Sequence, residues 1–207
     1  MFHNRKQAAV KLAKSLEKYK KEHPVVIGIP RGGLETAYYV ARHLHAELAF
    51  ILVKKLSAVD NPEYAIGAVT EDGTVYYNPG TKEKFSREYI DAIEQQKRKE
   101  IEKRRKLYRN IQLFPKLKNK TVIIVDDGIA TGATILAVVA VCKKGNAEKI
   151  IVASPVCPHD VTKQLSHEVD DIVMLKDPDE FSAVSDFYEN FQNIDDEEAL
   201  DFLKRDS

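Results

Sequence analysis

Four short apolar runs constrain the fold of this chain more than any other feature of its sequence. They are VVIGI at 25–29, ELAFILV at 47–53, TVIIV at 121–125 and KIIVAS at 149–154. Runs of this length, rich in β-branched residues, are typical of strands buried on both faces. Apolar residues at helical spacing follow the first run at 34–44 and the third run up to residue 144, which predicts two βαβ units. We therefore predict an α/β fold, with a parallel twisted sheet flanked by helices.

The other local patterns predict smaller elements around this sheet. They are a helix at 5–22 closed by Pro24, a β-hairpin of 66–69 and 74–77, a long polar helix at 81–109, and a last strand at 171–175. Gly145 is expected to cap the helix of the second βαβ unit. Asp195 and Glu198 form a capping box, which predicts a short final helix.

Composition limits the number of domains and the classes of partner. A length of 207 residues favours one domain that can bury a core without disulfides. The 32 basic and 32 acidic side chains cancel, so no overall field draws the chain to nucleic acid or to an anionic membrane. Two cysteines, Cys142 and Cys157, indicate a reducing compartment and lack the spacing of metal ligands. The first 22 residues are charged and no run approaches about 18 apolar residues. We therefore expect a soluble, cytoplasmic protein.

The segment VIIVDDGIATGAT at 122–134 carries the strongest chemical pattern. Ligands of open α/β sheets lie beyond the carboxyl ends of the strands. Here a strand delivers two adjacent carboxylates that can accept hydrogen bonds from vicinal hydroxyls, as on a ribose. A small-residue turn then opens a helix whose free amides and dipole favour a phosphate. The pattern predicts a sugar phosphate site at Asp126, Asp127, Gly128, Ala130, Thr131, Gly132, Ala133 and Thr134.

At these thirteen positions the chain resembles the type I phosphoribosyltransferases, whose signature is an apolar strand, two acidic residues and a turn ending in Thr-Gly-x-Thr. The segments 60–69 and 181–191 also resemble an uncharacterised subgroup of predicted phosphoribosyltransferases. The purely structural alternative is a plain N-cap followed by a plain helix start. The resemblance implies transfer of ribosyl 5-phosphate from phosphoribosyl pyrophosphate (PRPP) to a nitrogenous base, with release of pyrophosphate through an oxocarbenium-like transition state.

The same resemblance assigns roles to basic and glycine residues after the first two strands. The loop PRGG at 30–33 matches the family's pyrophosphate loop, which implies binding by Arg31, Gly32 and Gly33 and often includes a strained peptide bond that either glycine could accommodate. Lys54 and Lys55, at the end of the second strand, match a basic position that reaches pyrophosphate, and Lys55 matches better. The alternatives are a simple tight turn and a solvated strand end.

A Mg²⁺ cofactor is implied together with PRPP. This ion prefers phosphate and hydroxyl oxygens and keeps most of its waters, so Asp126 and Asp127 would contribute mainly through water. Arg31 and Lys55 would stabilise the charge that develops on the leaving group. The expected catalytic residues are therefore Asp126, Asp127, Lys55 and Arg31.

The resemblance further implies a single domain over 1–207, with a core at about 24–56 and 120–176. A hairpin and lid insertion is expected at about 57–119, with 81–109 as the candidate lid, and a hood over the acceptor at about 177–207. His159, Phe187 and Tyr188 are candidate base-binding residues, although a helix entry and core anchors explain them as well. Glu63, His159 and Asp160 are candidates for a general acid or base. Ala130 replaces an acidic residue of 6-oxopurine enzymes, which counts against hypoxanthine or guanine.

Two other functions are compatible with the same residues. One is a PRPP-sensing regulator, because the segment 97–106 carries seven basic and two acidic residues and could contact nucleic acid. A solvated face with internal ion pairs explains that segment better, so we expect no nucleic-acid or membrane partner. The other function is hydrolysis of PRPP or a related phosphosugar. Family members are commonly dimers, which implies a homodimer.

Overall fold

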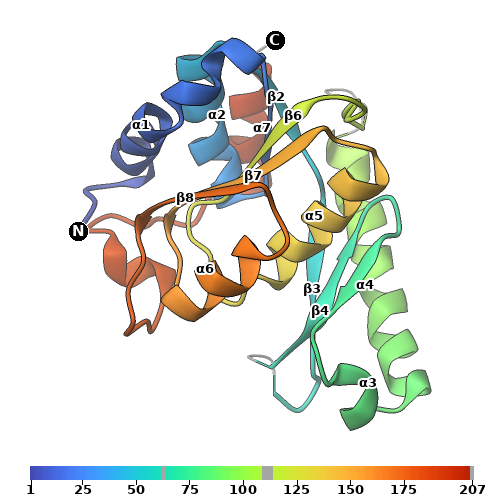
Figure 1. Ribbon diagram of the computed structural model, residues 1–207. Coiled ribbons are helices and arrows are strands. Elements are labelled where there is room, and N and C mark those ends of the chain that lie inside the picture. The colour runs from blue at the N-terminus through green and yellow to red at the C-terminus, as the bar shows by residue number, and fades with distance from the viewer. Residues whose placement is uncertain (62–63, 109–113, 206–207) are drawn as a thin grey trace.

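The computed structural model describes residues 1–61, 64–108 and 114–205. Its main sheet has five parallel strands in the order β2-β1-β6-β7-β8 (Figure 1). The strands are β1 Val25–Gly28, β2 Glu47–Phe50, β6 Thr121–Val125, β7 Lys149–Val156 and β8 Asp171–Lys176. The parallel α/β fold predicted from the apolar runs is confirmed.

Helices cover both faces of this sheet because its side chains alternate between two apolar clusters. Val26 of β1 packs in the cluster that contains α1, α2 and α7, whereas Val25 and Ile27 pack in the cluster that contains α5 and α6. The helices are α1 Arg5–Ser15, α2 Gly32–Leu44, α5 Ala133–Lys144, α6 His159–Ser166 and α7 Asp196–Lys204. The sheet is therefore the central layer of three, with its carboxyl edge left for loops.

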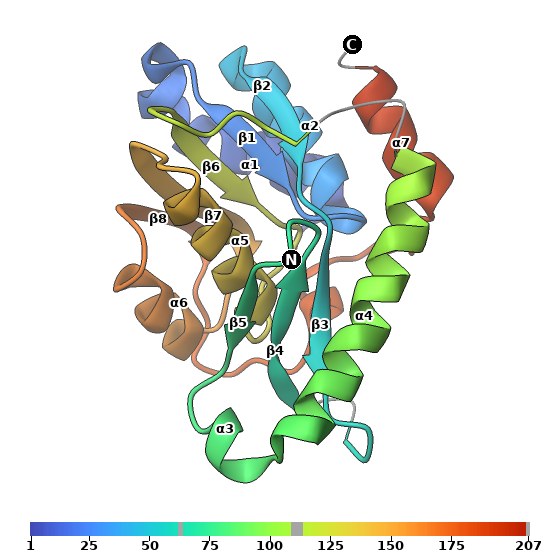
Figure 2. The same ribbon diagram turned by 90° about the vertical axis from the view of Figure 1, so that its right-hand side faces the viewer.

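A second, smaller sheet lies beside this core and contains the predicted hairpin. It is antiparallel, in the order β3-β4-β5, with bounds β3 Val53–Ser57, β4 Ala65–Thr70 and β5 Val75–Tyr77. In Figure 2, α4 (Arg87–Tyr108) runs along this sheet on the side of β3. Val53 and Ala68 pack with the α5 cluster and Leu56 with the α4 residues, so the small sheet separates α4 from α5.

The single strand expected over 47–53 is wrong. The chain leaves the main sheet after Phe50 and enters the small sheet at Val53. The chain passes from one sheet to the other at Leu52. The Leu52 N–H donates to Glu71 Oε1 and the Leu52 carbonyl accepts from the Glu71 N–H, each at 2.9 Å. An uninterrupted apolar run gives no sign of such a change of sheet.

Two predicted helices are also shorter than expected. The 5–22 helix ends at Ser15 and continues as a 3₁₀ helix, Glu17–Glu22. Leu16 and Tyr19, both buried, have the three-residue spacing that suits this tighter turn. The 81–109 helix is divided into α3 (Thr81–Lys84) and α4 by Phe85, whose backbone is extended. The predicted capping box opens α7, and Gly145 caps α5, as expected.

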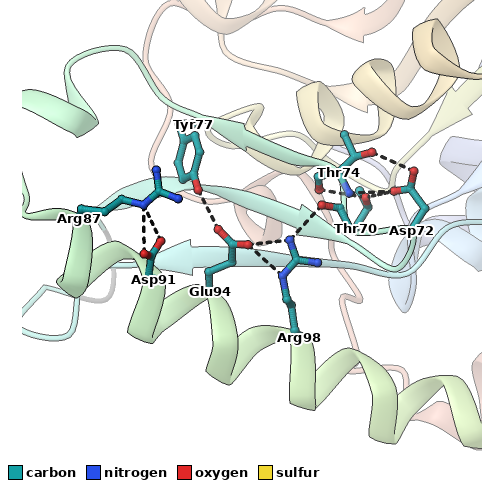
Figure 3. Close-up of polar contacts among 9 residues, drawn as sticks. Thr70, Asp72, Thr74, Tyr77, Arg87, Asp91, Glu94 and Arg98 are labelled. Atoms are coloured by element: carbon teal, nitrogen blue, oxygen red, sulfur yellow. Dashed lines mark hydrogen bonds and ion pairs between the residues drawn. The ribbon is translucent and has the colours of Figure 1, made fainter.

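The helix α4, which makes up most of the segment 81–109 expected as a lid, is anchored to the small sheet. Its apolar residues Ile93 and Ile101 are buried. Glu94 accepts from the Tyr77 hydroxyl at 2.7 Å and from Arg98 Nη2 at 2.6 Å (Figure 3). Arg98 Nη2 also donates to the carbonyl of Gly73 in the hairpin turn at 3.0 Å. The helix is thereby fixed to the small sheet.

The helices of the described residues include none with the length and apolar character that a membrane span requires.

Candidate functional site

The carboxyl ends of β1, β6 and β7 bring the predicted loops together at one edge of the main sheet. The β1 strand pairs with β6, and β6 pairs with β7, all in parallel. Backbone hydrogen bonds continue past the strand ends, since the N–H groups of Ile29 and Ile129 donate to the carbonyls of Val125 and Val156. The two motifs, which lie far apart in the sequence, are therefore neighbours in the fold.

The Gly32–Gly33 turn, which is the first turn of α2, lies directly against the two carboxylates. A side chain at Gly32 would overlap the Asp127 carboxylate, and a Cβ at Gly33 would lie 2.6 Å from Asp126 Oδ1. The unusual peptide bond of this loop joins Pro30 to Arg31 in the cis form, one residue before the glycines that were expected to accommodate it. Close approach to the carboxylates explains why this turn contains two glycines.

The two carboxylates differ in their surroundings. Asp126 Oδ1 accepts the Asp127 N–H at 2.9 Å. Burial and the neighbouring Asp127 carboxylate raise the pKa of Asp126 well above its usual range, while the charge of Arg5 acts in the opposite direction. Asp127 Oδ2 accepts from Arg5 Nε at 2.6 Å. The acidic turn therefore has one carboxylate paired with a cation and one that holds its proton more strongly.

The predicted phosphate turn has the expected form. Gly132 precedes α5 with a φ of +72°, in the left-handed region, and its Cβ position is 3.0 Å from the Val161 side chain. Ala130 and Thr131 are exposed, and Ala133 is the first helical residue. The first amides of a helix have no partners inside it. With Thr134 in the first turn, the backbone is suited to an anion.

The basic residues are placed differently from the expectation. Lys54 and Lys55 lie inside β3, not at the end of a main-sheet strand. Lys54 faces α4 and pairs with Glu100 at 3.2 Å. Since side chains alternate along a strand, Lys55 projects from the opposite face, the one that packs on α5. Arg31 is exposed at the start of α2. The two lysines therefore lie on opposite faces of β3, and Lys54 is the one that pairs with α4.

The segment expected as a hood covers the acidic turn. A side chain at Gly128 would overlap Val184 of the 3₁₀ helix Val184–Phe187. Phe187 is half-buried and stacks on Phe181 at 5.7 Å between ring centres. Tyr188 is only 5% exposed, and its hydroxyl donates to the Asp127 carbonyl. Tyr188 thus has a packing position, which does not fit the expected stacking on a base.

The remaining acid–base candidates lie around the start of α6. His159 Nδ1 is 2.9 Å from Asp177 Oδ2, and this carboxylate raises the pKa of the exposed imidazole. Asp160 is exposed in the first turn of α6. Glu63 lies outside the described residues. His159 is therefore the candidate whose ring is oriented by a partner.

The basic segment 97–106 is largely neutralised by ion pairs. Four of its seven basic side chains pair with carboxylates: Lys97 with Glu100, Arg98 with Glu94, Arg104 with Asp196 and Arg105 with Glu71, at 2.6–3.6 Å. This arrangement agrees with the interpretation of a solvated face.

Arg5 and Glu35 are candidate site residues that the sequence patterns missed. Both line an open cavity of about 460 Å³ between α1, α2, α7 and the segment 190–194. Burial raises the pKa of Glu35. One sequence feature could have drawn attention to Arg5. It lies four residues before Ala9, in phase with the buried stripe of α1.

The carboxylates of the acidic turn provide oxygen atoms, the donor type that Mg²⁺ prefers. Arg5 and the Asp127 N–H already donate hydrogen bonds to two of these carboxylate oxygens. In the part of the chain that the structure describes, no three His, Cys, Asp or Glu side chains gather as a possible metal cage. These residues fit an ion held mostly by ligand oxygens and water.

Comparisons with known proteins agree with this geometry. The family model described as a phosphoribosyl transferase domain matches residues 2–192. A protein of Mycobacterium tuberculosis strain H37Rv, provisionally named a phosphoribosyl transferase, is 35% identical over 209 residues. The match covers 99% of this chain and 47% of that protein, so the chain spans about half the length of the curated relative.

Two solved structures share the fold. The crystal structure of TT1426 from Thermus thermophilus has a TM-score of 0.86 and 34% sequence identity, covering 99% of this chain and 98% of that one. A purine phosphoribosyltransferase from Pyrococcus horikoshii has a TM-score of 0.52 and 22% identity, covering 92% of both chains. At that identity the second likeness shows the fold alone.

Proposed function

Because this chain belongs to the family of phosphoribosyl transferase domains, we propose that it transfers ribosyl 5-phosphate from PRPP to a nitrogenous base and releases pyrophosphate. The observation that carries the proposal is the contact between the Gly32–Gly33 turn and the two carboxylates of the acidic turn. It joins a candidate pyrophosphate loop to a candidate ribose site, and the phosphate turn follows in the same loop.

Each group of residues has one task in this proposal. The amides of 130–134 bind the 5-phosphate, and Asp126 and Asp127 bind the ribose hydroxyls. Arg31 and Lys55 hold the pyrophosphate, whose negative charge grows as the bond to the sugar breaks. A cation that binds a growing charge stabilises the transition state more than the ground state.

Mg²⁺ would be held at the acidic turn, by Asp126 and Asp127 through water, and would supply further positive charge to the pyrophosphate. The acceptor base would lie under the segment 181–187, beside Phe187 and His159. The absence of an acid at Ala130 argues against a 6-oxopurine as the acceptor.

The test is incubation of the protein with PRPP, Mg²⁺ and a panel of nitrogenous bases, followed by mass spectrometry of pyrophosphate and new nucleotide. Asp126→Asn and Asp127→Asn are the inactive controls. Pyrophosphate and nucleotide together support the transferase. Pyrophosphate without nucleotide would identify a hydrolase, and PRPP binding without any turnover would identify a regulator.

A further inference from the structure

The Asp127 carboxylate is held by a residue from the first helix. Arg5 Nε donates to Asp127 Oδ2 at 2.6 Å, and the two side chains are only 7% and 14% exposed. Arg5 Nη1 donates to the Gln192 carbonyl at 2.6 Å, and its guanidinium lies 3.8 Å from the centre of the Phe191 ring. The arginine therefore has little freedom to change its orientation.

The backbone of Asp127 is held by the same part of the molecule. The Tyr188 hydroxyl donates to the Asp127 carbonyl, and the Tyr188 ring packs against Phe2 with 5.5 Å between ring centres. Residues from both terminal regions thus fix one acidic residue.

Stability alone gives a poor reason for this arrangement. A buried arginine–aspartate pair loses much hydration energy, and well-packed apolar side chains often stabilise a fold as well or better. A buried pair does, however, hold a functional carboxylate in one orientation, which is what a binding site needs from its supporting residues.

We infer that Arg5 is a positioning residue for ribose recognition, which holds Asp127 Oδ2 and leaves Oδ1 as the oxygen that accepts the ribose 2-hydroxyl. The inference rests on the proposed function, because it requires a ribose at the acidic turn. Arg5 acts only through Asp127.

The test compares the binding of ribose 5-phosphate and 2-deoxyribose 5-phosphate to the full chain by calorimetry. Both ligands carry the 5-phosphate, but only the first has the 2-hydroxyl. The unchanged protein is expected to prefer ribose 5-phosphate about tenfold, the usual effect of one hydrogen bond to a charged group. Arg5→Gln is expected to remove most of this preference and to leave the affinity for the deoxy sugar nearly unchanged.

Two further variants separate positioning from general damage. Arg5→Lys keeps the charge and is expected to restore part of the preference. Lys6→Gln removes the neighbouring, exposed cation and should keep the full preference. Thermal unfolding of each variant is recorded, because a fold defect would lower the affinity for both sugars alike.

The possible results test the role of Arg5 and the proposed function separately. A preference that survives in folded Arg5→Gln overturns the inference and leaves the proposed function intact. If Arg5→Gln does not fold, Arg5→Met, which also removes the charge but keeps an unbranched stem beside Phe191, carries the test, and an unchanged preference there overturns the inference. Equal binding of both sugars by the unchanged protein also overturns it, whereas binding of neither sugar contradicts the proposed function itself.

Discussion

At the scale of single residues, glycine serves two different purposes at this site. Gly32 and Gly33 leave room for the two carboxylates, and any side chain there would meet an oxygen atom. Gly132 instead has a left-handed backbone, with Val161 close to its Cβ position. The first purpose is close approach and the second is conformation, so substitutions at the two places should fail for different reasons.

Gly132→Ala is expected to destabilise the fold by about 1 kcal/mol, the usual effect of a left-handed conformation on an L-residue. It should also weaken binding of ribose 5-phosphate, because Val161 at 3.0 Å forces the phosphate turn to shift. Gly80→Ala is the matched control. Gly80 has a φ of +76° and nothing within 4 Å of its Cβ position, so it should lose similar stability and no ligand affinity. Calorimetry and urea unfolding of both variants measure the difference.

Lys55→Ala is expected to lower turnover about tenfold to a thousandfold, or roughly 1.4 to 4 kcal/mol of transition-state free energy. Binding of ribose 5-phosphate should stay nearly intact, since that ligand lacks pyrophosphate. Lys54→Ala removes the adjacent lysine, whose partner is Glu100 on α4, and should keep its turnover. Equal losses of turnover in the two variants would contradict the role of Lys55. Steady-state kinetics with PRPP make this comparison.

The residues of the motif could be predicted from the sequence, but the side chains that hold them in place could not. Asp126, Asp127 and Gly132 follow a strand in a pattern with direct chemical meaning, so the sequence alone proposes them as site residues. Arg5 lies on a helix 122 residues before Asp127 in the sequence, and nothing local shows that the two side chains pair. Buried charge pairs depend on tertiary contacts that periodicity does not encode.

At the scale of elements, the sequence predicts strands and helices better than their membership in sheets. The apolar run of 47–53 has no glycine or proline at the point where it passes from one sheet to the other. Phe85 interrupts the 81–109 helix because its ring packs between Tyr64 and Tyr89. Both differences involve a contact far along the chain, Leu52 with Glu71 and Phe85 with Tyr64, and such contacts override local propensity.

The hairpin turn provides a test of the attachment between the small sheet and α5. Asp72 accepts from the Thr70 and Thr74 hydroxyls (Figure 3) and from Lys144 on α5. Partial burial would raise the pKa of Asp72, but the hydrogen bonds outweigh it and lower the value to about 2. Its ordinary value is 3.8, so the carboxylate stabilises the fold above about pH 4. This contribution disappears as the pH falls through 2.

Asp72→Asn is therefore expected to lower the free energy of unfolding at pH 7 by about 1 kcal/mol, after allowance for solvent screening. The difference from the unchanged protein should narrow between pH 7 and pH 3. Asp91→Asn, which removes an exposed partner of Arg87, serves as the control and should have little effect at either pH. Urea unfolding at both pH values provides the measurement, and a difference independent of pH would argue against the assignment.

At the scale of the whole molecule, the apolar core on the α5 face of the main sheet excludes solvent from both cysteines. Burial raises the pKa of Cys142 to about 12 and that of Cys157 to about 11. Both thiols are fully buried and should react very slowly with a thiol reagent at pH 8, because the thiolate is the reactive form. Two equivalents should react after unfolding in guanidinium. Fast modification of either thiol in the native protein would show that its core opens locally.

The contact between Phe2 and the segment after Phe187 has a consequence for synthesis on the ribosome. The Phe2 N–H donates to the Phe187 carbonyl at 2.7 Å, and the Glu189 N–H donates to the Phe2 carbonyl at 2.8 Å. At about 5–20 residues per second, the segment 187–189 is made roughly ten to forty seconds after Phe2. Helix α1 is synthesised long before the segment that follows Phe187. In the nascent chain Arg5 therefore cannot yet donate to both Asp127 and Gln192. The proposed sugar site can therefore form only when translation has passed Gln192.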